Sequence, residues 1–254
     1  MLVAFSLIII AAIRLARRRQ LYIRRIEGLS AIDEAIGRAT EMGRPMLCST
    51  GLSATSAGGI EIIPLQALSI TSYILRASAR FGTRAIVAVY DPQMMPITTD
   101  AVQNAYTAEG RPELYNPDDV RFLSSRQFAY AAAVSGILQR EKVAASFLFG
   151  YFYAEAMIFA ETGQQVGAIQ VAGTPAYLQI PFLIAACDYV IIGDEFYAAG
   201  AYLSREPTLL GSIVGQDICK GILLFGVLIG SILLSLAAVT GSPIGQSLLK
   251  QFGK

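Results

Sequence analysis

Two apolar runs stand at the ends of the chain. The first, residues 1–13, is apolar apart from Ser6, and the second, residues 221–241, contains no charged residue. A helix of about 20 residues, rising 1.5 Å per residue, crosses the roughly 30 Å hydrocarbon core of a bilayer. The second run therefore predicts a transmembrane helix, since a soluble helix of that length rarely lacks a polar face.

The first run is shorter and ends abruptly at Arg14. Leu15, Ala16 and residues 21–23 continue its helical pattern, and arginines near a helix end can reach the lipid headgroups. We expect a second transmembrane helix here, with an interfacial amphipathic helix as the alternative. A cleaved secretory signal is not expected, because the positive charge follows the apolar run instead of preceding it.

Six arginines follow the first run and indicate the orientation of the chain. They are Arg14, Arg17, Arg18, Arg19, Arg24 and Arg25. Lys and Arg accumulate on the cytoplasmic side, so we expect the N-terminus outside and the following domain inside. The cluster adjoins an apolar helix and the net charge is only +1. Its expected partners are therefore the headgroups of the lipid bilayer and not nucleic acid.

Short apolar runs alternate with helical patterns between the two ends. Strands are predicted at 45–49, 84–90, 120–123, 145–150, 167–171 and 189–193. Helices are predicted at 30–42, 64–81, 97–109, 125–141, 153–163 and 175–186. The strands are continuously apolar, which is typical of a parallel sheet covered on both faces. The predicted fold class is α/β, with a Rossmann-like, doubly wound, mainly parallel sheet flanked by an N-terminal and a C-terminal transmembrane helix.

This pattern predicts four segments. They are an N-terminal transmembrane or juxtamembrane helix (1–26), a cytoplasmic α/β domain (27–212), a C-terminal transmembrane helix (213–241) and an extracytoplasmic tail (242–254). The expected location is the inner cell membrane.

Composition limits the chemistry. Hydrophobic residues make up 54% and charged residues 15% of the chain, against about 45–50% and 25% in typical soluble proteins. The chain has three scattered cysteines and no histidine. This excludes histidine bases and histidine-ligated metals, and we predict no catalytic residue, metal or cofactor.

A candidate ligand site follows from strand ends, because open parallel sheets bind ligands beyond the carboxyl ends of their strands. The loop at 49–59 is rich in glycine and hydroxyl groups, which suit an anion. Its candidate residues are Ser49, Thr50, Gly51, Ser53, Gly58 and Gly59, joined by Asp91 after the second strand. The loop matches neither GxGxxG nor GxxxxGK[ST], so an ordered turn that lets elements pack closely is the alternative.

Carboxylates also follow two later strands. Asp194 and Glu195 come after the sixth strand, and Glu155 lies one helical turn after the fourth. Asp194 and Glu195 could act as acid and base or bind a divalent cation with Asp91. Acidic residues at such a position more often cap the next helix and complement its dipole.

Small residues in the last apolar run predict helix association. Gly226 and Gly230 form a GxxxG pattern, which lets membrane helices approach closely. Gly211 and Gly215 form a second such pair just before the run. Residues 196–203, rich in tyrosine and alanine, would suit subunit contacts.

Three segments resemble a known family. They are residues 81–92 (FGTRAIVAVYDP), 120–123 (VRFL) and 192–203 (IGDEFYAAGAYL), the last followed by Gln216 and Asp217. They are similar to the uncharacterised prokaryotic membrane proteins grouped as domain of unknown function 6754, over about residues 30–239. The resemblance implies that residues 193–195 and the glycine loop belong to a shared architecture, but it supplies no activity.

Two functional hypotheses remain. The favoured one is a membrane-anchored, self-associating scaffold, a homo-oligomer, because no catalytic signature is present. The alternative is a regulatory or enzymatic domain that binds a nucleotide or small anion at the 49–59 loop, beside Asp91 and Asp194.

Overall fold

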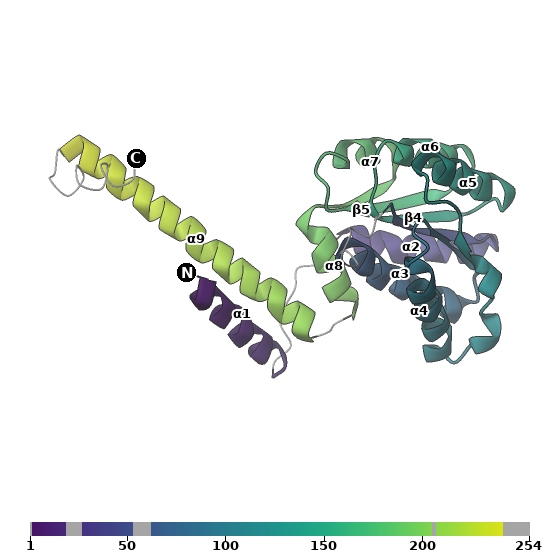
Figure 1. Cartoon of the computed structure of the whole chain (residues 1–254), viewed down its shortest axis with the longest axis horizontal. Coiled ribbons are helices and arrows are strands. Elements are labelled where there is room, and N and C mark those ends of the chain that lie inside the picture. Colours follow the sequence, from purple (N-terminus) through teal and green to yellow (C-terminus); the bar gives the residue numbers. More distant parts are fainter. Residues whose placement is uncertain (1, 19–26, 53–61, 205–206, 241–254) are drawn as a thin grey trace. The chain divides into compact units, whose positions relative to one another are not determined.

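All six predicted strands are present and form one parallel sheet (Figure 1). The strands are β1 (Met46–Gly51), β2 (Ala85–Val89), β3 (Val120–Phe122), β4 (Ala145–Tyr151), β5 (Ile169–Thr174) and β6 (Tyr189–Ile192). Their order across the sheet is β3-β2-β1-β4-β5-β6, and every neighbouring pair is parallel. The mixed α/β class predicted from the alternating pattern is therefore confirmed.

The structure is a computed structural model that describes residues 2–18, 27–52, 62–204 and 207–240. It divides into two units, Ile23–Ser204 and the combination of Met1–Tyr22 with Arg205–Lys254. We refer to the first as the α/β unit and to the second as the helical unit.

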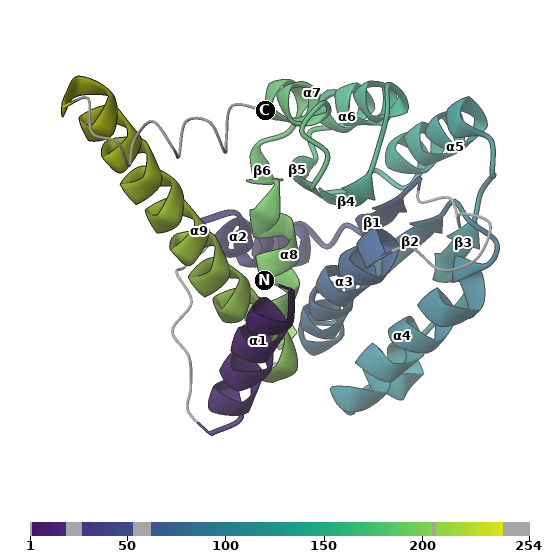
Figure 2. The same ribbon diagram turned by 60° about the vertical axis from the view of Figure 1, so that its left-hand side comes forward.

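Helices cover both faces of the sheet (Figure 2). One face carries α2 (Glu27–Met42), α3 (Ile62–Phe81), α4 (Met94–Ala108) and α8 (Asp194–Ser204). The other carries α5 (Gln127–Arg140), α6 (Glu155–Gln165) and α7 (Ile180–Ala186). Two short 3-10 helices, η1 (Pro112–Leu114) and η2 (Pro117–Asp119), precede β3.

Alternating residues of each central strand enter the two cores. In β1, Met46 and Cys48 pack with one cluster and Leu47 packs with the other. All six β1 residues and all five β2 residues are buried. This explains why β2 and residues 46–48 of β1 are continuously apolar, since both sides of each strand face a helix layer.

Two segments differ from the sequence prediction. Residues 196–203, expected on a surface for subunit contacts, lie in α8, where Phe196 and Ala199 are fully buried. The predicted helix at 175–186 begins only at Ile180, with Pro181 in its first turn. Residues before Ile180 form a turn that leaves Tyr177 and Leu178 exposed.

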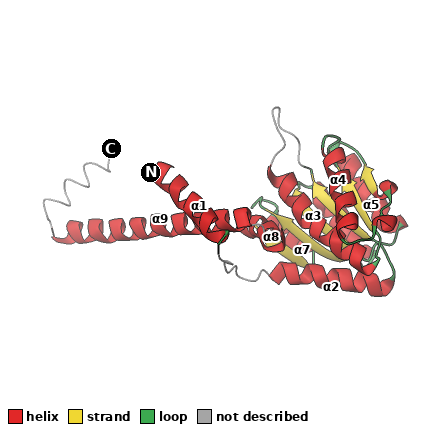
Figure 3. Ribbon diagram, turned by 90° about the horizontal axis from the view of Figure 1, so that it is seen from below, coloured by secondary structure: helices red, strands yellow, loops and turns green. Residues whose placement is uncertain are grey.

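The helical unit contains α1 (Leu2–Ala16) beside α9 (Pro207–Thr240) (Figure 3). A Cβ built on Gly211 would lie 2.5 Å from Ile13 Cα, and one on Gly215 would lie 3.0 Å from Ile9 Cα. The two helices are therefore in close contact and run antiparallel, since increasing numbers in α9 meet decreasing numbers in α1.

Only α9 has the length and composition of a membrane span among the described residues. Its candidate span is Pro207–Leu233, with 27 residues and a mean hydropathy of 1.7, and 11% of its most apolar window is buried. This candidate includes residues 213–233 of the predicted transmembrane segment. The helix α1 ends before Arg17, and its expected continuation through residues 21–23 lies outside the described residues.

Candidate functional site

The carboxyl ends of β1 and β4 are the centre of the candidate site. The chain builds β1, β2 and β3 toward one edge of the sheet and β4, β5 and β6 toward the other, so β1 and β4 are neighbours at the point of reversal. Gly51 ends β1 with φ +78°, and Gly150 lies in β4 with φ +129°. Both angles belong to backbone regions that favour glycine.

These glycines allow the two strands to approach closely. A Cβ on Gly150 would lie 2.3 Å from the Thr50 carbonyl oxygen, and one on Gly51 would lie 2.6 Å from the Tyr151 carbonyl oxygen. The strands remain paired beyond a register shift, because Leu52 N–H donates to the Tyr151 carbonyl over 2.7 Å. At this position the structure supports the interpretation of a turn that permits close packing. The predicted ligand residues Ser53, Gly58 and Gly59 lie outside the described residues.

Ser49 belongs to a buried hydroxyl network. Its Oγ lies 2.8 Å from the hydroxyl of Tyr130, which also donates to the Ala88 carbonyl oxygen over 3.2 Å. Gly51 N–H donates to Ser49 Oγ over 3.3 Å. Burial raises the pKa of Tyr130 well above its ordinary value, and the hydrogen bond from Ser49 opposes that rise. These contacts fix β1, β2 and α5 to one another, and Thr50 beside them is also buried.

Asp91 lies in the turn that precedes α4. Its carboxylate accepts a hydrogen bond from Gln93 N–H over 2.9 Å, and its carbonyl accepts one from Met94 N–H over 3.0 Å. This is the local turn that aspartate side chains favour. Asp91 is 9% exposed, so its side chain is directed into the fold at the end of β2.

Asp194 and Glu195 lie far from Asp91. They form the first turn of α8 after β6, whereas Asp91 follows β2. Those two strands are four positions apart in the sheet, which corresponds to about 19 Å at an interstrand spacing of about 4.8 Å. The described residues contain no group of three His, Cys, Asp or Glu side chains that could hold a metal ion. The location of Asp194 and Glu195 fits an interaction with the α8 dipole.

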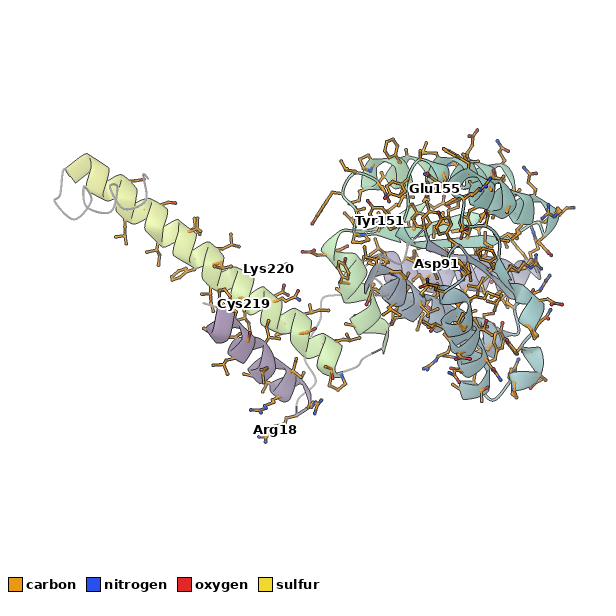
Figure 4. All side chains as sticks on the ribbon, in the orientation of Figure 1. Arg18, Asp91, Tyr151, Glu155, Cys219 and Lys220 are labelled. Atoms are coloured by element: carbon orange, nitrogen blue, oxygen red, sulfur yellow. The ribbon has the colours of Figure 1, made fainter. Side chains whose placement is uncertain are left out.

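Glu155, which is not among the predicted ligand residues, is the most buried carboxylate at this edge. It is 0% exposed and accepts hydrogen bonds from Gln127 Nε2 and from Tyr153 N–H, the latter over 2.7 Å. These bonds link the start of α5 to the start of α6. Figure 4 shows Glu155 and Tyr151 beside the end of β4, with Asp91 nearer the opposite helix layer. The sequence signal was its position after the fourth strand, but nothing in the pattern predicted full burial.

Gln179 is another buried polar side chain at the carboxyl edge. Its Oε1 accepts a hydrogen bond from Phe152 N–H over 2.8 Å. Like Ser49, Tyr130 and Glu155, it uses its polar group to hold the fold. These described side chains of the carboxyl edge are thus hydrogen-bonded to other parts of the fold.

The opposite, amino edge holds a cavity of about 390 Å³ lined by Thr40, Gly43, Arg44, Pro45, Phe81, Gly82, Thr83 and Arg84. Arg84 pairs with Asp119 over 2.6 Å and with Glu141 over 3.0 Å. The hydrogen bonds that Arg84 donates to the Asp119 carboxylate raise the pKa of Arg84. Arg44 donates to the carbonyls of Lys142 and Val143. Both guanidinium groups therefore join segments of the fold.

The helical unit contains the remaining predicted residues. Arg14, Arg17 and Arg18 are exposed at the end of α1, where Arg18 is labelled in Figure 4. With Leu7, Ile10, Ala11 and Leu15 they line an open groove. Arg19, Arg24 and Arg25 lie outside the described residues. A Cβ built on Gly226 or Gly230 would meet nothing within 4 Å, so none of the described residues covers this GxxxG pair.

Comparison with known protein families places the chain within a described family. The model of a family described as "Domain of unknown function (DUF6754)" matches residues 1–244. No curated protein and no solved structure matches the chain.

Proposed function

Since the chain belongs to the DUF6754 family, which assigns it no activity, we propose from its own geometry that it is a membrane-anchored, self-associating scaffold. In this proposal α9 crosses the inner cell membrane and the α/β unit lies on its cytoplasmic side. The observation that carries it is the division of α9 into a part that contacts α1 and an apolar part with an uncovered Gly226 and Gly230.

The antiparallel contact between α1 and α9 supports the orientation. Both helices join the α/β unit at the same end of the helical pair, where Arg14, Arg17 and Arg18 are exposed. Arginines at that end favour the cytoplasmic side. At 1.5 Å per residue, the 15 residues of α1 reach about 22 Å, short of the roughly 30 Å core. We therefore infer that α1 enters the inner part of the bilayer beside α9, and that a full second span would need residues beyond Ala16.

Self-association follows from the exposed half of α9. Glycines four residues apart let two membrane helices approach until their backbones touch. The side chains around this pair are apolar and exposed, including Phe225 at 66% and Val227 at 66%. A second copy of the chain supplies a matching surface, as expected for symmetric dimers.

The test compares substitutions on opposite faces of α9. The full chain is reconstituted in vesicles with donor- and acceptor-labelled copies, and energy transfer between copies is measured as lipid is added. We expect Gly226→Leu combined with Gly230→Leu to weaken association by about tenfold, the effect of losing roughly 1–2 kcal/mol of helix packing. Gly221→Leu is the matched control, because Gly221 is equally open but lies on another side of the helix. A wild-type chain that stays monomeric at every lipid ratio would exclude the scaffold.

A second candidate function rests on the strand order. The order 3-2-1-4-5-6 is that of Rossmann-like, doubly wound sheets, which bind nucleotides where the order reverses. In this chain the reversal lies between β1 and β4, and β1 leads into the glycine-rich residues 53–61. Thermal unfolding of the full chain with nucleotides and inorganic phosphate tests the idea. A ligand at 100 times its dissociation constant should stabilise the α/β unit by about 2.7 kcal/mol, and an unchanged midpoint with every ligand would count against this candidate.

A further inference from the structure

Helix α1 has one side packed on α9 and one side open. Ala12 is 6% exposed, because it lies on the packed side against Gly215 of α9. The other side carries Leu7, Ile10 and Leu15, which are 62%, 47% and 48% exposed. The described residues therefore leave an apolar strip uncovered along α1.

This open side forms a groove of about 770 Å³, which we call the α1 groove. Its lining residues run from Leu7 to Arg18 and recur three and four residues apart, which places them on one face of the helix. At 1.5 Å per residue, the distance from residue 7 to residue 18 is about 16 Å. This is close to the depth of one leaflet, half of the roughly 30 Å hydrocarbon core.

The α1 groove is apolar at one end and positively charged at the other. The apolar end is lined by Leu7, Ile10 and Ala11, and the charged end by Arg14, Arg17 and Arg18. Figure 4 labels Arg18 at the charged end. A ligand that fits both ends needs a hydrocarbon part and an anionic part.

The three arginines are held together at the end of α1. Arg17 N–H donates to the Ile13 carbonyl over 3.2 Å, and Arg18 N–H donates to the Leu15 carbonyl over 3.0 Å. None of the three arginines forms an ion pair with a side chain that the structure describes. Like charges four residues apart repel each other, and a helix end supplies only about half a negative charge. The arginines therefore keep an excess of positive charge that an anion would balance.

We propose that the α1 groove binds one anionic phospholipid of the cytoplasmic leaflet. The lipid phosphate lies between the arginines, since guanidinium groups bind phosphate through paired hydrogen bonds, and one acyl chain lies along Leu7, Ile10 and Ala11. The inference rests on the proposed membrane anchor, in which the arginines are on the cytoplasmic side, and it names the class of lipid that the anchor selects. With its phosphate on that side, the lipid extends its acyl chain toward the bilayer centre, as in the leaflet itself.

Charge distinguishes this occupant from three others. A second copy in the same orientation would bring its own arginines to the same depth, so contact between two α1 grooves would place positive charge against positive charge. Phosphatidylcholine carries a cationic group beside its phosphate, and the arginines repel that group. A soluble phosphate would satisfy the arginines but would leave Leu7 and Ile10 uncovered.

The lipid selectivity of the full chain tests the proposal. The detergent-solubilised chain is titrated with phosphatidylglycerol or phosphatidylcholine of identical acyl chains, and native mass spectrometry counts the lipids bound per chain. Arg14→Gln combined with Arg18→Gln removes two charges from the groove. The control, Arg38→Gln combined with Arg76→Gln, removes two charges from exposed positions of the α/β unit.

A second pair of variants tests the apolar end at constant charge. Ala11→Phe fills the groove, and Leu224→Phe, at a side chain of α9 that is 65% exposed, is its control. All variants are also assayed for flotation with vesicles and for energy transfer between labelled copies.

We expect the wild-type chain to bind one phosphatidylglycerol, saturably and in preference to phosphatidylcholine. Loss of the two groove arginines should weaken phosphatidylglycerol binding roughly 30-fold. Ala11→Phe should weaken it about tenfold by displacing about two methylene groups of the acyl chain. Both controls should bind lipid as the wild type does.

Equal binding of the two lipids, or phosphatidylglycerol binding that either groove variant leaves unchanged, would overturn the lipid site. Displacement of the lipid by glycerol phosphate in solution would assign the arginines to a soluble anion and also overturn it. Loss of energy transfer in Ala11→Phe would assign the groove to a second copy, with the same consequence. In each of these cases continued flotation would leave the anchor intact, whereas a wild-type chain that fails to float would overturn the anchor itself.

Discussion

Substitution of Gly150 by alanine tests the close approach of β1 and β4. At φ +129°, an alanine occupies a backbone region that essentially only glycine adopts, and its Cβ would lie 2.3 Å from the Thr50 carbonyl oxygen. The backbone term costs about 1–3 kcal/mol, and forcing extra volume into a packed site adds about 1–3 kcal/mol. We expect Gly150→Ala to lower the free energy of unfolding of the α/β unit by about 2–6 kcal/mol.

Gly43→Ala is the matched control. Gly43 also has a positive φ, +61°, but a Cβ there would meet nothing within 4 Å. Its cost should therefore be the backbone term alone, about 1–2 kcal/mol. Comparing the two variants separates strain in the backbone from contact between the strands.

Tyrosine fluorescence during urea unfolding of the detergent-solubilised chain is a suitable assay. Of the 12 tyrosines, only Tyr22 lies outside the α/β unit, so the signal reports on that unit and not on α9. At a urea dependence of about 2 kcal/mol per molar, the midpoint should fall by about 1–3 M for Gly150→Ala and by less than about 1 M for Gly43→Ala. Equal shifts would refute the reasoning, since they would show that the Thr50 carbonyl does not approach Gly150 as described.

Three further predictions concern the same unit. Burial raises the pKa of the Cys48 and Cys187 thiols to about 12. Maleimide labelling of these thiols in the folded chain should therefore be slow near neutral pH, and its rate should still increase with pH above 9, where the labelling rate of an ordinary thiol has reached its plateau. Fast labelling of Cys48 at pH 7.5 would contradict its burial. The raised pKa values also mean that the unfolded chain loses these protons first, so stability should be unaffected below about pH 8.5 and fall as pH rises toward 12, as urea midpoints across that range would record. Arg84→Met removes the 2.6 Å partner of the buried Asp119 and should lower the free energy of unfolding by about 1–3 kcal/mol, whereas Arg80→Met, which breaks only the exposed pair with Glu109, should cost less than about 1 kcal/mol.

The strands could be predicted from sequence because their chemistry is local. A strand buried on both faces is mostly apolar, and β1, β2 and β4 have that property. Strand order carries no such local signal. Whether β4 pairs with β1 or with β3 depends on contacts between residues about 100 positions apart, such as Met46 with Ala145.

The same limit applies to the candidate site. Glu155 is fully buried because Gln127, 28 residues away, and Tyr153 N–H satisfy its carboxylate. The sequence shows an acidic residue after a strand, but it does not show the hydrogen-bond partner that offsets the cost of burying the carboxylate. For the outer face of α7, the sequence predicts too much burial. Its apolar helical pattern indicates burial within the fold, yet Phe182 and Ile184 are exposed.

The length of α1 explains why one GxxxG pair of α9 is covered and the other is open. Ile13 lies beside Gly211 and Ile9 lies beside Gly215. Four residues back along α1 therefore correspond to four residues forward along α9. Continued at this register, Leu2 lies near Ile222, one turn before Gly226.

Extending α1 by about eight residues of alanine and leucine before Leu2 should carry it along Gly226 and Gly230, at about 1.5 Å per residue. The lengthened helix would then occupy the surface that we assign to a second copy, and energy transfer between labelled copies should fall as it does for the Gly226→Leu and Gly230→Leu variant. An extension rich in serine and asparagine, too polar to follow α9 into the bilayer, serves as the control and should leave association unchanged. Unaltered energy transfer in both extended chains would mean that copies meet through another surface, because two helices cannot occupy the same face of α9.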